Sequence, residues 1–210
     1  YRYFVDLAHL PRFFKQGLGA IEMRNDILNY LRGELRCRCE QPSNQFGMGV
    51  YDHIEVVVKN GAFLAERYGA DKEVVMIAAW LHDIASVTDY SLYPEHHLHG
   101  AEMAQGILSQ WDYAPEKIAL VQNCIRSHRG SVPLDRESVE ELCVADADAV
   151  SHFDSLPSLL YLAYRERGLE FEEGKNFVKE KLERSFQKLS SQSRELYRNK
   201  YQQVMDILNG

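Results

Sequence analysis

Apolar residues recur along most of the chain with the period of an α-helix. Between residues 51 and 68 they return every three or four positions, which is typical of a helix that buries one face. The same spacing predicts further helices over 21–36, 71–82, 95–110, 115–128, 136–154, 157–168, 171–188 and 193–208. No stretch alternates apolar and polar residues as a strand would. The pattern therefore predicts an all-α protein.

Segments without this period divide the chain. Residues 1–20 mix aromatic residues with glycines and predict an irregular arm, while 40–49 and 86–95 read as polar loops. Gly130 and Pro133 interrupt the pattern again. We expect an N-terminal arm and helix (1–49) packed on a core (50–155), with C-terminal helices (156–210) completing the same domain. Those last helices either pack on the core, which is the default, or mediate a homodimer.

Several histidines fall in line with the apolar residues of their helices. His53 shares a stripe with Val57 and Leu64, and His82 follows Ala78 by four positions. His99 aligns with Met103 and Ile107, and His128 ends the stripe of the helix before it. A side chain on an apolar stripe points into the core, so four imidazoles should be buried. His96 and His97 precede their helix and are expected near a pocket mouth, whereas His9 and His152 read as structural or surface residues.

Carboxylates accompany these histidines. Asp83 follows His82 directly, and Asp146 sits within the apolar stripe of 136–154, with Asp148 two positions later. Burying an unpaired carboxylate is costly, so a cation must compensate for it. One buried histidine is more often a structural residue than a ligand, but several histidines with carboxylates reverse that expectation. Imidazole and carboxylate together suit divalent metals, so we predict a metal site built from several helices.

Composition narrows the class of protein. Hydrophobic residues make up 45% and charged residues 26% of the 210 positions, which is ordinary for a globular chain. A formal net charge of −7 argues against a broad nucleic-acid or anionic-membrane surface. Four cysteines form neither a zinc pattern nor a dense disulfide framework. With no run of about twenty apolar residues and no leader pattern, the expected location is the cytoplasm.

The order of these residues resembles a known family. His53, then His82-Asp83, then Asp146-Ala147-Asp148 is similar to the isolated histidine, HD pair and distant aspartate of the HD superfamily of metal-dependent phosphohydrolases, over residues 50–155. The resemblance implies an HD-domain helical bundle with flanking N- and C-terminal helices. It also implies one or two divalent metals (Mn, Mg, Fe, Ni, Co or Zn) held by His53, His82, Asp83 and one later aspartate. Periodicity favours Asp146, while relatives with an Asp-x-Asp element favour Asp148.

Two further histidines bear on the number of metals. Binuclear members of this superfamily, such as the HD-GYP phosphodiesterases, carry extra histidines where this chain has His99 and His128. A second metal at these two residues is therefore one expectation, and a leaving-group acid at either is the other. The chain departs from HD-GYP because Ile84-Ala85-Ser86 follows the HD pair and no Gly-Tyr-Pro triplet occurs.

The implied activity is hydrolysis of a phosphomonoester, a phosphodiester or a nucleotide by a metal-activated water. His82, Asp83 and His128 or His99 would take part in catalysis. The candidates to contact a small phosphorylated substrate are Arg126, Arg129 and Lys59. We expect that substrate to be a nucleotide. Two alternatives remain: a di-iron oxygenase with the ligands His, His-Asp, His, His and Asp, and a non-catalytic nucleotide-binding sensor. The sequence leaves the substrate open, because pocket shape decides specificity.

Overall fold

The computed structural model describes residues 23–129 and 136–210, and these residues form helices without any strand. The all-α expectation is thereby confirmed. The arm predicted over 1–20, with His9, lies outside the described residues, as do Gly130 and Pro133. None of the described helices combines the length and apolar character needed to cross a bilayer. The four cysteines are free thiols, of which only Cys37 is exposed.

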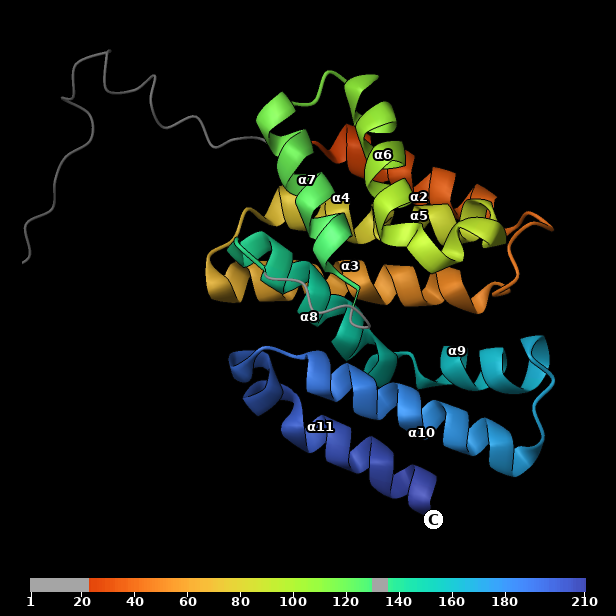
Figure 1. The fold of residues 1–210 in the computed structure, drawn as a ribbon. Coiled ribbons are helices and arrows are strands. Elements are labelled where there is room, and N and C mark those ends of the chain that lie inside the picture. The colour runs from red at the N-terminus through yellow and green to blue at the C-terminus, as the bar shows by residue number, and fades with distance from the viewer. Residues whose placement is uncertain (1–22, 130–135) are drawn as a thin grey trace, which may run out of the picture.

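Helices that lie far apart in the sequence meet in the centre of the fold. Figure 1 shows α3 (Gly49–Tyr68) running across the molecule beside α8 (Val139–Asp154), with α2 (Asn25–Cys39) and α4 (Lys72–Leu81) above it. Gly61 of α3 permits this close packing. A Cβ on Gly61 would lie 3.1 Å from Cγ1 of Val75 and 3.8 Å from Cβ of Ala147. The helices that carry His53, His82 and Asp148 therefore approach closely at one place.

Local capping sets where the HD pair falls. α3 ends at Gly69, whose φ of 75° is left-handed and suits glycine. Asp71 then begins α4 by accepting hydrogen bonds from the backbone N–H groups of Glu73 and Val74. α4 runs to Leu81, and the short α5 (Ile84–Thr88) follows after a break of two residues. His82 and Asp83 occupy that break, in the interior of the protein.

Two longer helices lie between the HD pair and residue 129, after α5. α6 (His96–Ser109) and α7 (Pro115–Ser127) pack against each other, and α7 also contacts α4 and α8. Pro115 is the first residue of α7, where its missing N–H costs nothing. His96 begins α6 and His128 directly follows α7. Both histidines therefore lie at helix ends that face the centre of the bundle.

The C-terminal helices pack on α8. In Figure 1, α10 (Phe171–Lys188) and α11 (Ser191–Asn209) form the lower layer of the molecule, beneath α8 and α9 (Leu156–Tyr161). The apolar side chains that these helices and the turn between them bury are Val178, Leu182, Leu189, Tyr197 and Met205. α10 thereby forms one wall of the region around Asp148.

Several predicted boundaries differ from the structure. The first described helix covers Asn25–Cys39, whereas the pattern placed it over 21–36. The loop expected over 86–95 is wrong, because α5 extends to Thr88 and a 3₁₀-helix, η2 (Tyr90–Glu95), follows. The helix after Pro157 ends in a π-helical turn, η3 (Leu162–Glu166). Such short helices cover too few residues to show a helical period.

Candidate metal centre

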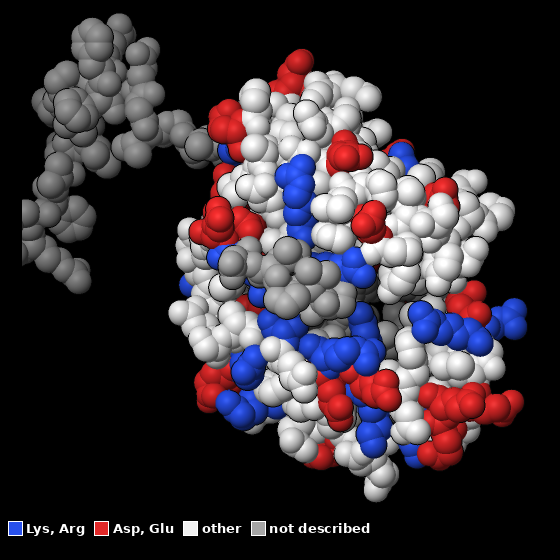
Figure 2. Space-filling model, in the orientation of Figure 1, with Lys and Arg blue, Asp and Glu red and all other residues white. Residues whose placement is uncertain are grey.

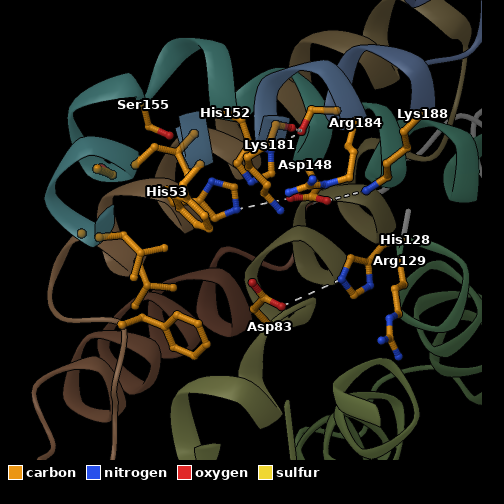
Figure 3. Close-up of a pocket in the computed structure, with 18 of the residues that line it drawn as sticks. His53, Asp83, His128, Arg129, Asp148, His152, Ser155, Lys181, Arg184 and Lys188 are labelled. Atoms are coloured by element: carbon orange, nitrogen blue, oxygen red, sulfur yellow. Dashed lines mark hydrogen bonds and ion pairs between the residues drawn. The ribbon is translucent and has the colours of Figure 1, made fainter. Parts of the chain in front are cut away.

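Six side chains from five helices or their ends form two adjoining clusters. His53, His82 and Asp148 make one cluster, and Asp83, His96 and His128 make the other. Within each cluster, one nitrogen or carboxylate oxygen of every member lies within 4.8 Å of the others. Figure 3 shows His53, Asp148, Asp83 and His128 around one cavity. These are residue types that bind divalent metals, at distances a single ion can bridge with small adjustments.

The first cluster is buried and braced by its neighbours. Nε2 of His53 lies 3.3 Å from Oδ1 of Asp148, whose other oxygen accepts a hydrogen bond from the Lys188 ammonium. The ring of His53 stacks on that of His152, with centroids 4.8 Å apart. His152 is held in turn by a hydrogen bond between its Nδ1 and the hydroxyl of Ser185. His152 was expected to be a structural or surface residue; it is buried, and its ring lies behind that of His53.

Three of the imidazoles are oriented in the same way. Nδ1 of each donates to the carbonyl oxygen three residues earlier: His82 to Ala79 at 2.7 Å, His96 to Tyr93 at 2.8 Å, and His128 to Ile125 at 2.6 Å. A proton fixed on Nδ1 leaves the lone pair on Nε2, which is the form that binds a metal. All three Nε2 atoms therefore act as donors of electron pairs toward the clusters.

Two observations show that these lone pairs fit a cation. Nε2 of His82 is buried and has no hydrogen-bond partner. Nε2 of His96 and Nε2 of His128 lie 3.2 Å apart, although each carries a lone pair. Buried polar atoms are rarely left unpaired, and two lone pairs repel each other at this distance. A metal ion would relieve both situations, so the donor set fits a divalent cation.

Asp83 joins the two clusters. One of its carboxylate oxygens lies 3.4 Å from Nε2 of His82, and the other lies 3.5 Å from Nε2 of His96. The second oxygen is also 3.9 Å from Nε2 of His128. One carboxylate thus presents an oxygen to each side. Such an arrangement accommodates either one ion or a pair of ions with Asp83 between them.

Burial and neighbouring charges shift the pKa values of three of these groups. Burial lowers the pKa of His128 well below its ordinary value, so that this ring is neutral. Burial alone would raise the pKa of Asp148, but the adjacent Lys188 and His53 outweigh it and hold that pKa well below the usual range. Burial would likewise lower the pKa of His82, yet the Asp83 carboxylate raises it. A bound cation would replace that proton on His82.

The structure separates the two candidate aspartates of α8. Asp148 lies in the first cluster, whereas both oxygens of Asp146 accept hydrogen bonds from Ser190, one from its N–H at 2.9 Å and one from its hydroxyl. Residues two apart on a helix point about 200° from each other. The preference for Asp146 is therefore corrected in favour of Asp148. Periodicity misled because α8 is buried on nearly every side, so both aspartates are interior.

The structure also separates the histidines of α6. His96 belongs to the second cluster, while His99 is only half-buried and does not line the cavity. The predicted stripe followed the large residues Met103 and Ile107, but the middle of the buried face consists of small residues, with Leu108 after them. Gly100 is one of them, and a Cβ there would lie 3.3 Å from Ile125. Close helix packing thus turned His96, rather than His99, toward the site.

The cavity beside the clusters has a volume of about 600 Å³, within the usual range for small-molecule sites. Of the three predicted phosphate contacts, Arg129 lines it. Lys59 is exposed on α3 and Arg126 bonds to Asn123, and neither reaches the cavity. Sequence reasoning missed four cations from the C-terminal part of the chain, namely Arg167, Lys181, Arg184 and Lys188. A signal was present, because three of them recur on one face of 171–188.

The fold and the site together define an all-α protein with a buried histidine and aspartate centre. Residues 50–152 match the HD domain family. His53, the His82-Asp83 pair and Asp148 all lie within that match. The chain is an HD-domain protein, as the resemblance implied.

Solved structures share this architecture. The Bacillus subtilis protein YpgQ has a TM-score of 0.65 at 18% identity, with 88% of this chain and 93% of that chain covered. Its complex with ADP has a TM-score of 0.60 at 15% identity over 87% and 94%. A predicted HD superfamily hydrolase from an uncultured Thermotogales bacterium scores 0.50 at 23% identity, over 81% and 91%. At these identities the likeness establishes the fold.

Curated relatives match over a shorter part of their own length. Ribonuclease Y of Streptococcus sanguinis is 29% identical over 134 residues, which is 64% of this chain and 22% of the relative. Ribonuclease Y of Rubrobacter xylanophilus is 29% identical over 129 residues, which is 61% of this chain and 22% of the relative. The match therefore spans about a fifth of these relatives.

Proposed function

We propose that this protein is a metal-dependent phosphohydrolase that acts on a small nucleotide. The observation that carries the proposal is the buried Nε2 of His82, which has no hydrogen-bond partner and lies close to ligand atoms of Asp148, His53 and Asp83. His53, His82, Asp83 and Asp148 would hold a divalent cation there. Bound at these residues, the cation would activate a water molecule toward phosphorus and offset negative charge in the transition state.

The cavity supports a nucleotide because its walls differ in chemistry. One side carries cationic side chains from α10, and another carries the rings of Phe46 and Tyr93, whose centroids are 5.3 Å apart. Cations suit the phosphates of a nucleotide, and aromatic faces suit its base. The structure of YpgQ with ADP shows that a related fold accommodates a nucleotide. Another relative, ribonuclease Y, has a name that denotes action on RNA, which is a polymer of nucleotides.

The second cluster supports a second metal ion. A pair of metal ions would in turn support a second candidate function. Asp83, His96 and His128 lie around one point, and Asp83 presents its other oxygen to His82. The six residues match the ligand types of the di-iron oxygenases that the sequence resemblance offered as an alternative. Two tightly held iron atoms per chain, with consumption of oxygen, would favour that reaction. Exchangeable Mn or Mg with release of phosphate or pyrophosphate would favour hydrolysis.

The first test is the metal content and phosphate release of four proteins: the wild type and the variants His82→Ala, His96→Ala and His99→Ala. We expect His82→Ala to lose most of its metal and at least about a hundredfold in hydrolysis of a nucleotide panel, since it removes a central ligand. His96→Ala should lose only a metal held by the second cluster, of which His96 is a member. His99→Ala should resemble the wild type, because His99 does not line the cavity.

Two outcomes would contradict the proposal. Phosphate release that is equal in the wild type and His82→Ala would assign the hydrolysis to a contaminant. Nucleotide-induced thermal stabilisation without turnover by the metal-loaded wild type would point to a sensor instead. Circular dichroism of each variant shows whether it is folded and so separates loss of ligands from loss of structure.

A further inference from the structure

The cavity contains more positive charge than its carboxylates can balance. Among the described residues, five cationic side chains line it, against the two carboxylates Asp83 and Asp148. In Figure 2, lysine and arginine side chains gather in the band between the upper helices and the C-terminal layer. The cations of the lining are Arg129, Arg167, Lys181, Arg184 and Lys188. This excess stands out in a chain whose net charge is −7.

Three of these cations form a row on α10. Lys181, Arg184 and Lys188 are spaced by three and four residues, so they lie on one face of the helix. Figure 3 shows them projecting toward the side of the cavity that holds Asp148. From Lys181 to Lys188 the helix rises about 10 Å. That length exceeds one phosphate group and is comparable with a chain of two or three.

Within the row, Lys181 has no partner of its own. Lys188 bonds to Asp148, and Arg184 lies 3.5 Å from Glu180 at the exposed rim. The Lys181 ammonium makes neither a hydrogen bond nor a direct ion pair with any described residue, although the charges of Asp148 and Asp83 act on it. Its burial lowers its pKa, which reflects the cost of keeping an ammonium group away from water. Lys181 is half-buried, and a half-buried cation without a direct partner beside a cavity is compensated most directly by an anionic ligand.

We infer that Lys181, with Arg184 beside it, binds the linked phosphates of a nucleoside diphosphate or triphosphate and so selects these substrates over monophosphates. The inference rests on the proposed function and specifies its substrate class. A single phosphate near the metal ligands would leave the charge of Lys181 uncompensated. A second or third phosphate would extend along the row and reach Lys181. Charge-assisted contacts with phosphate oxygens are among the stronger polar contacts in proteins.

The test measures phosphate binding without turnover. Metal-free protein in chelator is titrated with inorganic triphosphate, pyrophosphate and orthophosphate at one fixed ionic strength, because salt screens such contacts. We expect the wild type to bind triphosphate more tightly than orthophosphate. Lys181→Met should weaken triphosphate binding by about tenfold or more, and Lys181→Arg should retain most of it. Lys179→Met is the matched control, since Lys179 lies on the same helix but does not line the cavity.

A second measurement uses metal-loaded protein. Lys181→Met should raise the KM for diphosphate and triphosphate substrates about tenfold, and leave the KM for monophosphates unchanged. Equal triphosphate binding by Lys181→Met and the wild type, or equal affinity of the wild type for orthophosphate and triphosphate, would overturn the inference. Absence of turnover together with Lys181-dependent binding of triphosphate would overturn the proposed function alone. Thermal unfolding checks that Lys181→Met is folded. We expect it to be, because the variant replaces a half-buried charge by an apolar side chain.

Discussion

At the scale of single residues, two buried aspartates only two positions apart on α8 have different partners. Asp146 receives two hydrogen bonds from Ser190, which begins α11, and so joins α8 to the C-terminal layer. Asp148 faces His53 and His82. The partners of each carboxylate offset the free-energy cost of its burial. Asp146 has backbone and hydroxyl donors, and Asp148 has Lys188 and His53. One aspartate therefore stabilises the fold, and we propose that the other binds metal.

The two aspartates should give opposite results when replaced. Asp146→Ala leaves the Ser190 donors unpaired, so we expect the free energy of unfolding to fall by about 2 kcal/mol with metal content unchanged. Asp148→Ala should lose the metal instead. Denaturant unfolding and elemental analysis of both variants check this, with Asp146→Asn as the milder control because it keeps one acceptor. Loss of metal from a fully stable Asp146→Ala would show that the assignment is reversed.

At the scale of elements, helix ends position the chemistry. His82 and Asp83 occupy the break between α4 and α5, His96 begins α6, and His128 follows α7. At such positions a ring can bond to the backbone carbonyl three residues earlier and still point away from the helix. The bounds of α4 therefore affect the site, because His82 and Asp83 directly follow its last residue. The start of α4 is set by Asp71.

Removing the cap of α4 should weaken the fold in a measurable way. Asp71→Ala loses the two hydrogen bonds to Glu73 and Val74 and the ion pair with Lys117, whose atoms are 3.0 Å apart. We expect a loss of about 1 kcal/mol in the free energy of unfolding. Asp71→Asn keeps the cap and loses only the ion pair, so it should cost a few tenths of a kcal/mol, about what a partly exposed pair contributes. Equal losses in the two variants would assign the effect to the ion pair.

At the scale of the whole molecule, polar networks tie the layers together. Glu73 of α4 accepts hydrogen bonds from the Arg24 N–H at 2.7 Å, the Tyr113 hydroxyl at 2.9 Å and the Lys117 ammonium at 3.0 Å. These partners lie before α2, before α7 and within α7. Burial of Glu73 raises its pKa, but the three hydrogen bonds and the Lys117 charge outweigh burial and lower the pKa below its ordinary value. The network therefore stabilises the protein when Glu73 is ionised.

This network predicts a pH dependence with a definite sign. Because the pKa of Glu73 is lower in the folded state than in the unfolded state, its contribution is fully present above about pH 4.5 and is lost as the pH falls through the folded-state value. The wild type should exceed Glu73→Gln in free energy of unfolding at neutral pH, and the difference should shrink below about pH 4.5. Urea unfolding across this range measures it. Glu183→Gln, at an exposed position on α10 outside this network, is the control variant.

Much of this protein follows from its sequence, because periodicity and spacing are local properties. The apolar period identified an all-α chain, and the order of His53, His82-Asp83 and the later aspartates identified the HD domain. Tertiary structure decided the rest. It brought together Asp148 rather than Asp146 and His96 rather than His99, since the rotation of a helix about its axis depends on how closely its neighbours approach, here at Gly61 and Gly100. It also turned the row of cations on α10 toward the cavity, because a charged helix face is solvated in isolation and only packing against α8 converts it into a wall of a site.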